Sequence, residues 1–205
     1  MKIINETLEK DAIDLCVNCL AKQGSVLLLP TETVYGLFCR WDDEVAKNKI
    51  LNMKKRDGNK PFQMIIPNIN ALKNTNINIT KNIQILVDKF CPGPITIIAN
   101  LNTNKDSQTN TIGFRIPAFS FLISLMNHAQ CSLAATSANL SGNPPAQTVE
   151  DAINVLEGSP NLVVNADKIS GDPSTVVDMT TNSFKILRHG PISEIEIMEA
   201  LCLQD

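Results

Sequence analysis

Clusters of polar side chains beside apolar runs are the sequence features that could carry chemistry. Residues 30–36, PTETVYG, place three polar side chains after the apolar run at 25–30. Burying such groups is costly unless they line a cavity or find hydrogen-bond partners. The segment fits a binding site, and it fits equally well a strand-ending turn with local hydroxyl-to-backbone bonds. Residues 136–142, TSANLSG, and residues 173–175, PST, also adjoin apolar runs. Their small polar groups suit an anion or an amino acid, and a capped turn would explain residues 136–142 as well.

A run of basic residues ends the predicted helix at 43–55. Lys54, Lys55 and Arg56 are consecutive, and Lys60 follows shortly after them. These cations would clamp phosphate groups, with the arginine forming bidentate bonds and the lysines acting as point charges. Cations at a helix C-terminus also interact favourably with the helix dipole, so a solvated helix end explains the same run.

An arginine inside a predicted strand is a further candidate. Residues 111–117, TIGFRIP, alternate so that Arg115 shares a sheet face with Gly113. A partly buried guanidinium needs an acceptor. That acceptor is either a structural carboxylate or the carboxylate of a substrate, and the residues alone leave both open.

Several other chemistries lack the residues that they need. The sequence has no P-loop, dinucleotide-binding or nucleophile-elbow motif, and its two histidines fit surface or helix-cap positions. Cys16 and Cys19 form the one C-x-x-C pair, on an apolar helical stripe, which indicates reduced core thiols rather than a zinc site. The net charge of −3 does not predict a broad nucleic-acid-binding surface. No apolar run approaches the about 18 residues that cross a membrane, so we expect a cytoplasmic protein.

Helical and strand patterns alternate along the chain, which predicts an α/β or mixed α+β domain. Helices are expected at 7–24, 43–55, 80–90 and 119–128, after Thr148, and after Ser193, where Glu196 completes a capping box. Strands are expected at 25–30, 62–66, 95–99, 111–116, 132–136, 162–165, 176–179 and 184–187, and a surface loop at 102–110.

In their order and spacing these motifs resemble the Sua5/YrdC/YciO family. The matching runs are PTETVYGL at 30–37, MKKR at 53–56 with Lys60 and Pro61, PGPIT at 92–96, TIGFRIP at 111–117, TSANLSG at 136–142, PSTVVD at 173–178 and ILRHG at 186–190. One such run is weak evidence, whereas the ordered set, spread over residues 7–202, is specific.

The resemblance implies a fold, an activity and a cellular context. The fold would be one YrdC-like domain over residues 1–205, an open twisted α/β sheet of YrdC/RibB type with flanking helices around a positively charged cavity, without the C-terminal extension of long Sua5 forms. The implied activity joins L-threonine, bicarbonate or CO2, and ATP carrying Mg²⁺ into L-threonylcarbamoyl-AMP and pyrophosphate. Downstream transferase proteins would then pass the threonylcarbamoyl group to adenosine 37 of tRNA.

The resemblance also implies roles for individual residues. Threonine would be bound by Thr33, Arg115, Ser137 and Ser174, and ATP by Arg56, Lys60, Thr111, Asn139, Gln147 and Arg188. Lys54 and Arg56 belong to the signature whose charges face the phosphates, and they are the expected catalytic residues. The chain departs from the family pattern at Asp57, where many members have proline, and at Ile65, where longer members often have a polar contact to threonine.

Two other functions remain as alternatives. Lys54, Lys55, Arg56 and Lys60 could form an RNA-binding patch in a YciO-like module without synthase activity. The acidic net charge and the scarcity of aromatic residues for base stacking weigh against it. Carbamoyl transfer in hydrogenase maturation, where a related domain lies within much larger proteins, is disfavoured by the absence of zinc-finger cysteine pairs.

Overall fold

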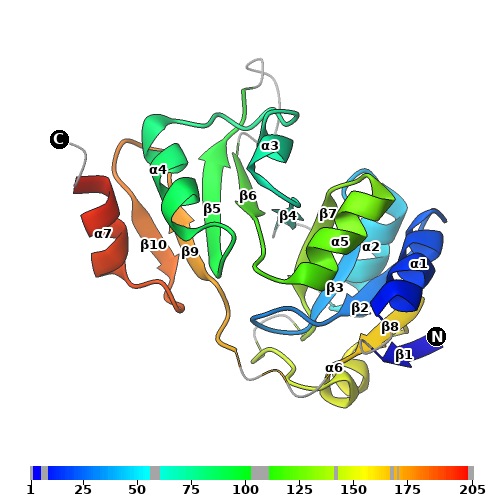
Figure 1. The fold of residues 1–205 in the computed structure, drawn as a ribbon. Coiled ribbons are helices and arrows are strands. Elements are labelled where there is room, and N and C mark those ends of the chain that lie inside the picture. Colours follow the sequence, from blue (N-terminus) through cyan, green and yellow to red (C-terminus); the bar gives the residue numbers. More distant parts are fainter. Residues whose placement is uncertain are drawn as a thin grey trace.

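One mixed sheet organises the chain (Figure 1). The computed structural model describes residues 2–5, 9–55, 61–102, 111–140, 143–166, 169 and 171–202. In these residues the strands are β1 (Lys2–Asn5), β2 (Leu27–Leu29), β3 (Gly36–Arg40), β4 (Gln63–Ile65), β5 (Ile95–Asn100), β6 (Thr111–Arg115), β7 (Leu133–Ser137), β8 (Leu162–Asn165), β9 (Thr175–Asp178) and β10 (Lys185–Arg188). The helices are α1 (Glu9–Leu20), α2 (Glu44–Met53), α3 (Ile69–Leu72), α4 (Lys81–Phe90), α5 (Ser120–Ala129), α6 (Val149–Val155) and α7 (Glu194–Cys202). The mixed α/β class expected from the sequence is confirmed.

The order of the strands in the sheet is β1-β8-β2-β3-β7-β4-β6-β5-β9-β10. Both parallel and antiparallel pairs occur along it, so the sheet is neither doubly wound nor a simple meander. Figure 1 shows two groups of strands, with β7 and β4 at the junction between them. Segments that are distant in the sequence are thereby brought to one central region.

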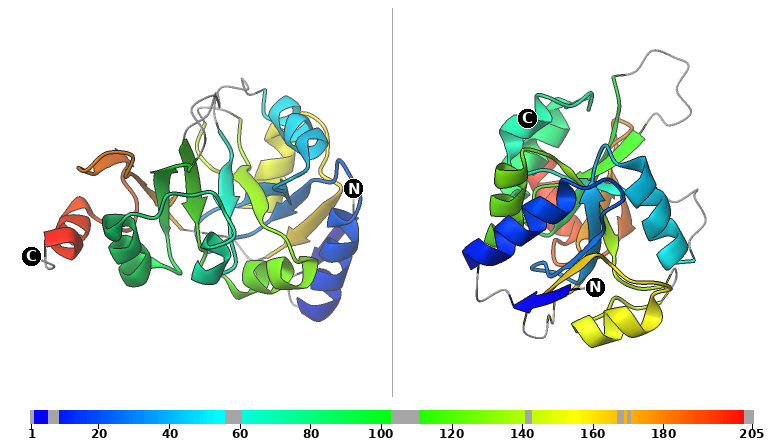
Figure 2. Two further views of the ribbon diagram at one scale, coloured as in Figure 1. Left: turned by 90° about the horizontal axis from the view of Figure 1, so that it is seen from above. Right: turned by 90° about the vertical axis from the view of Figure 1, so that its right-hand side faces the viewer.

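Three apolar clusters fix the helices on the sheet. Helices α1 and α5 pack on one side of β2, β3 and β8, and α2 and α6 pack on the other side (Figure 2, left). Helices α4 and α7 cover one face of β5, β6 and β9. On β5 the residues facing that cluster are Ile95, Ile97 and Ala99, and their alternation turns Thr96 and Ile98 to the opposite face.

Local signals account for the helix ends. The Thr80 hydroxyl accepts a hydrogen bond from Ile83 N at 3.3 Å and caps α4. At α7 the predicted capping box is confirmed, because Glu196 Oε2 accepts from Ser193 N at 2.8 Å and the Ser193 hydroxyl accepts from Glu196 N at 3.2 Å. The Ser193 hydroxyl also donates to Glu196 Oε2. This bond and the one from Ser193 N hold the pKa of Glu196 below its usual value.

The structure adds three elements that the sequence patterns did not predict, namely β1, β3 and α3. Strand β3 lies in the middle of the sheet and pairs with β2 and β7. It begins at Gly36, the last residue of the PTETVYG segment, for which the sequence left a turn and a binding site open. Most of the predicted loop at 102–110 lies outside the described residues.

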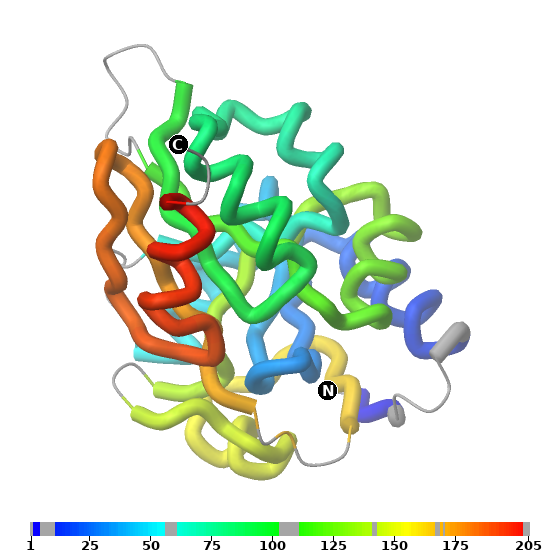
Figure 3. The backbone as a smooth tube through the Cα atoms, turned by 60° about the vertical axis from the view of Figure 1, so that its left-hand side comes forward, coloured from blue at the N-terminus to red at the C-terminus, as the bar shows by residue number. Residues whose placement is uncertain are grey.

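Strands β8 and β9 are consecutive in the sequence but belong to opposite groups of the sheet (Figure 3). Gly171, which precedes β9, packs directly on the loop before β3. A Cβ atom at Gly171 would stand 2.6 Å from the Thr33 carbonyl oxygen and 2.7 Å from that of Glu32. The close approach requires glycine at this position.

The cysteines of the described part are free thiols. Burial raises the pKa of Cys16 to about 12, and that of Cys39 to about 12 as well. The neutral, buried state of Cys16 agrees with its interpretation as a core thiol. Among the described residues no helix is long and apolar enough to cross a membrane.

Candidate active site

A cavity of about 460 Å³ opens on the face of β5 and β6 that α4 and α7 leave uncovered. Its size is in the range of small-molecule sites. The described lining residues are Thr33, Val34, Lys54, Pro61, Phe62, Gln63, Thr96, Ile98, Thr111, Gly113, Arg115, Ala135, Thr136, Ser137, Asn139, Pro145, Pro173, Ser174, Val176 and Arg188. They include three basic side chains and no acidic one, so this part of the wall favours an anionic ligand.

Lys54 enters the cavity from the C-terminus of α2. The residue is only 2% exposed, and its ammonium donates to the Ser137 carbonyl oxygen and, at 3.2 Å, to Asn139 Oδ1. Neutral oxygens bind an ammonium group without cancelling its charge. Lys54 is therefore positioned to attract a phosphate or carboxylate group.

The turn after β7 shapes the wall beside this lysine. The Ser137 hydroxyl donates to Asn139 Oδ1, and the Asn139 amide nitrogen donates to the carbonyl oxygen of Asn143. These bonds fix both side chains where they line the cavity. The predicted small-hydroxyl turn is thus a part of the cavity wall.

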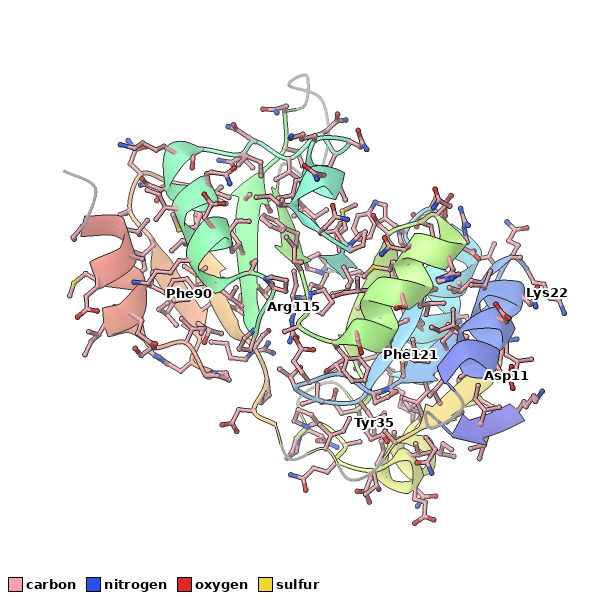
Figure 4. All side chains as sticks on the ribbon, viewed as in Figure 1. Asp11, Lys22, Tyr35, Phe90, Arg115 and Phe121 are labelled. Atoms are coloured by element: carbon pink, nitrogen blue, oxygen red, sulfur yellow. The ribbon has the colours of Figure 1, made fainter. Side chains whose placement is uncertain are left out.

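Arg115 lies between the two groups of strands (Figure 4) and is 6% exposed. Its Nη2 donates to Glu32 Oε1 at 2.7 Å, its Nη1 to the Thr33 hydroxyl at 3.1 Å, and its Nε to the Gly93 carbonyl at 3.3 Å. Of the two acceptors that the sequence left open for Arg115, a structural carboxylate is therefore present, and it belongs to Glu32. A guanidinium has five N–H groups, so two remain for a ligand carboxylate.

Glu32 is held as firmly as the arginine that it pairs with. Its Oε1 also accepts from the backbone N–H of Ala118 at 2.8 Å, whereas its buried Oε2 has no hydrogen-bond partner in the described structure. The carboxylate thus links the loop before β3 to the end of β6. It was not among the predicted site residues, although it lies in the PTETVYG segment.

On the opposite wall, four polar side chains form a chain of hydrogen bonds that we call the polar ladder: Gln63, Thr96, Ser174 and Arg188. The Gln63 amide nitrogen donates to Thr96 Oγ1, and the Thr96 and Ser174 hydroxyls are 2.8 Å apart. Arg188 donates from Nη2 to Ser174 Oγ at 3.0 Å and from Nε to the Ser174 carbonyl at 2.9 Å. The ladder crosses the cavity from β4 to β10.

The two arginines of the cavity repel each other. Burial lowers the pKa of Arg188 from its usual value, and the nearby charge of Arg115 lowers it further. Two positive charges that line one cavity favour an anion between them, because the anion relieves their repulsion.

A second cavity of about 50 Å³ adjoins the first and shares several of its walls. Thr33, Gln63, Arg115 and Ser137 line both spaces. The walls specific to the smaller space are mainly apolar: Phe38, Ile65, Pro117 and Leu122, beside Thr31 and Gly36. Ile65, expected to be a departure from the family pattern, thus contributes an apolar wall here.

The structure places most of the predicted site residues around one space. Those that line the larger cavity are Thr33, Lys54, Thr111, Arg115, Ser137, Asn139, Ser174 and Arg188. Arg56, Asp57 and Lys60 lie outside the described residues, so their roles stay predictions. Gln147 has an exposed side chain and is not among the described lining residues, so its assignment to ATP gains no support. Glu32, Gln63 and Thr96 are additions from the structure.

The structure is that of a mixed α/β protein with a cationic cavity, and comparison with known proteins gives its family. Residues 19–190 match the Sua5/YciO/YrdC family, which is described as "Telomere recombination". Because the match covers most of the chain, the protein belongs to this family.

Individual relatives extend this result. The chain is 28% identical over 200 residues to the threonylcarbamoyl-AMP synthase of Pyrococcus abyssi, covering 94% of this chain and 58% of that protein. It is 30% identical over 161 residues to the protein of the same name from Pseudoalteromonas atlantica, covering 75% and 85%. The crystal structure of P. abyssi Sua5 complexed with L-threonine superposes with a TM-score of 0.84 at 25% identity, over 98% of this chain and 61% of that chain. The chain thus spans less than two thirds of the P. abyssi protein.

Proposed function

We propose that the protein synthesises L-threonylcarbamoyl-AMP from L-threonine, CO2 derived from bicarbonate, and ATP, with release of pyrophosphate. The observation that carries the proposal is the cavity in which Lys54, Arg115 and Arg188 converge without an acidic side chain among the described lining residues. An adenylating enzyme must hold a triphosphate and an amino acid carboxylate together, and both are anions. Family membership and the shared name of several relatives support this choice.

The reaction divides into two steps. The threonine ammonium group first loses a proton to solvent. The resulting amine attacks CO2, and loss of a second proton from the nitrogen to solvent gives a carbamate. A carbamate oxygen then attacks the α-phosphorus of ATP, and the bond to the β-phosphate oxygen breaks to release pyrophosphate. Neither step needs a covalent bond to the protein.

Positioning and charge stabilisation are therefore the proposed means of catalysis. Holding the reactants in contact can lower the barrier by about 7–11 kcal/mol. Lys54 and Arg188 would stabilise the charge that develops on the phosphates, and Arg56 and Lys60 are proposed to join them. Mg²⁺ would enter with ATP, bound to its phosphates as a part of the substrate.

Threonine would bind next to the polar ladder. The two remaining N–H groups of Arg115 suit its carboxylate, and the hydroxyls of Thr33, Ser137 and Ser174 lie around the same space. The small apolar cavity beside Ile65 would accept the threonine methyl group. Such a pocket distinguishes one methyl group by only about 1–3 kcal/mol, so moderate discrimination against serine is expected.

The proposed product would be consumed by proteins that transfer the threonylcarbamoyl group to adenosine 37 of tRNA. An RNA-binding module without synthase activity is the weaker hypothesis, because the relatives carry the name of a synthase. No feature of the described surface favours RNA binding over ATP binding.

The test follows pyrophosphate release by the purified protein with ATP, Mg²⁺ and bicarbonate. We expect release that depends on L-threonine and falls when bicarbonate is removed, with L-threonylcarbamoyl-AMP detected by mass spectrometry. Pyrophosphate release that is independent of threonine, or none at all, would refute the proposed activity.

A further inference from the structure

Gln63 is the one member of the polar ladder whose side chain joins both cavities. It lies on β4, opposite Gly113 of the neighbouring strand β6, and its amide nitrogen is bonded to Thr96 on β5, beyond β6. The absence of a side chain at Gly113 leaves the path between β4 and β5 open. The bond to Thr96 fixes the Gln63 side chain. The other residues of β4, Met64 and Ile65, are buried and apolar.

The hydrogen bonds within the ladder determine which of its donors and acceptors remain for a ligand. Because Gln63 donates to Thr96 through nitrogen, its Oε1 is an acceptor, and no bond to this oxygen occurs in the described structure. Arg188 donates to Ser174 Oγ, so both hydroxyls of the Thr96–Ser174 pair already accept a bond. Whichever of them donates to the other, one hydroxyl hydrogen remains. The ladder thus offers a ligand one fixed acceptor and one donor.

The direction of Gln63 relative to Arg115 indicates which group of the amino acid it meets. Gln63 and Ile65 pair in register with Gly113 and Arg115, so all four share one face of the sheet. A carboxylate bound by Arg115 has only acceptors and cannot bond to Gln63 Oε1. The α-amino nitrogen is attached to the same carbon as that carboxylate and carries hydrogens, so it is the nearest donor.

On the basis of the proposed function, we propose that Gln63 binds the α-amino nitrogen of L-threonine through Oε1 and orients it for attack on CO2. A neutral amide oxygen suits this task. It holds the amine without the full charge of a carboxylate, which would stabilise the ammonium form and hinder its deprotonation. Thr96 and Ser174 act as positioning residues, because they keep the amide in one orientation.

Isothermal titration with L-threonine, without ATP, tests the assignment on Gln63→Met and Gln63→Glu. Gln63→Met removes the acceptor at nearly constant size, and we expect about tenfold weaker threonine binding. Gln63→Glu retains an acceptor oxygen and adds a negative charge that favours the ammonium form, so its affinity for threonine should be at least that of the wild type. Gln84→Met, the same substitution on the outer helix α4, is the matched control and should bind threonine normally.

Two threonine analogues identify the group that is bound. For 3-hydroxybutanoate, which lacks the α-amino group, Gln63→Met should not weaken binding. For L-2-aminobutanoate, which lacks the side-chain hydroxyl, the tenfold loss should persist. A loss that persists with 3-hydroxybutanoate, or disappears with L-2-aminobutanoate, would overturn the assignment to the amine.

The outcomes separate this inference from the proposed function. If the wild type binds threonine and releases pyrophosphate while Gln63→Met binds threonine equally well, only the role of Gln63 is wrong. If the wild type neither binds threonine nor shows threonine-dependent release, both proposals fail. Should Gln63→Met not fold, as judged by circular dichroism, Gln63→Ser has a side chain too short to reach the amine and carries the same expectation.

Discussion

Lys54 is a basic residue whose side chain is almost completely buried. Its ammonium donates to the Ser137 carbonyl oxygen and to Asn139 Oδ1. We therefore expect Lys54→Met to reduce threonine-dependent pyrophosphate release by about 100-fold or more, as for the loss of one preorganised donor at a developing charge. The measurement is a steady-state assay of pyrophosphate with ATP and threonine in excess.

The neighbouring lysine supplies the control for this prediction. Lys55 is exposed and pairs with Glu157 on the surface, so Lys55→Met should leave the rate within about twofold of the wild type. Equal effects of the two substitutions would show that the basic run acts as a solvated helix end. That is the alternative which the sequence left open.

Glu32 shows how a structural carboxylate can serve a binding site. It accepts from Arg115 and from the Ala118 backbone, and so it fixes the guanidinium at the edge of the cavity. Glu32→Ala would leave Arg115 without its charged partner and should lower the free energy of unfolding by about 3 kcal/mol. The KM for threonine should rise as well, because the guanidinium is no longer held in place.

Urea unfolding and threonine-dependent kinetics check this expectation. Glu157→Ala removes a carboxylate from the exposed pair with Lys55, and it should change the stability by less than about 1 kcal/mol. A Glu32→Ala protein with wild-type stability and wild-type KM would mean that Arg115 does not depend on this carboxylate.

The family motifs in the sequence predicted much of the site but not its internal bonds. Thr33, Arg115 and Ser174 were identified from motifs, and the structure places them around one cavity. Gln63 and Thr96 were missed because each is a single polar residue in an apolar run. Their importance comes from contacts between separate strands, and no local spacing encodes those contacts.

At the scale of elements, helix α2 connects the core to the site. Asp43 begins it, with Oδ1 accepting from Ala46 N at 2.9 Å and Oδ2 accepting from Gly24 N at 2.7 Å, and Lys54 ends it. Asp43→Ala would remove the N-cap and leave the Gly24 N–H without its acceptor. We expect the free energy of unfolding to fall by about 2 kcal/mol in urea titrations.

Asp42→Ala, one residue earlier, is the control for the loss of the cap. Asp42 forms an exposed pair with Arg40, which holds the pKa of Asp42 below its usual value but lies at the surface. This substitution should change the stability by less than about 1 kcal/mol. If the two variants were equally stable, Asp43 would not be the residue that anchors α2.

Elements with local signals were predicted well from the sequence, and the others were not. Helices α4 and α7 have capping residues and apolar spacing within their own segments. Strand β1 owes its existence to pairing with β8, which lies more than 150 residues away in the chain. Strand β3 follows a run of turn-forming residues, and only its pairing with β2 and β7 identifies it as central.

For the whole molecule, the cavity exists because distant parts of the chain meet at the junction of the two strand groups. Its walls come from the loop before β3, from β4 to β7, and from the segments around Ser174 and Arg188. The family pattern predicted which residues gather here, whereas physical reasoning from composition could not. The order of the strands depends on long-range pairing, and Gly171 is one of the contacts that bring these parts together.

Gly171→Ala tests that contact directly. The glycine does not need a left-handed backbone, so the added methyl group acts through its clash with the carbonyl oxygens of Glu32 and Thr33. Relieving the clash would displace the loop that holds Thr33 or the segment that leads to Ser174. We expect about 1–3 kcal/mol lower stability in urea unfolding and a weaker stabilisation by saturating threonine in thermal unfolding. Asp172→Ala changes the exposed next residue and should match the wild type in both measurements. If Gly171→Ala also matched it, the crossing segment would be free to move without disturbing the threonine site.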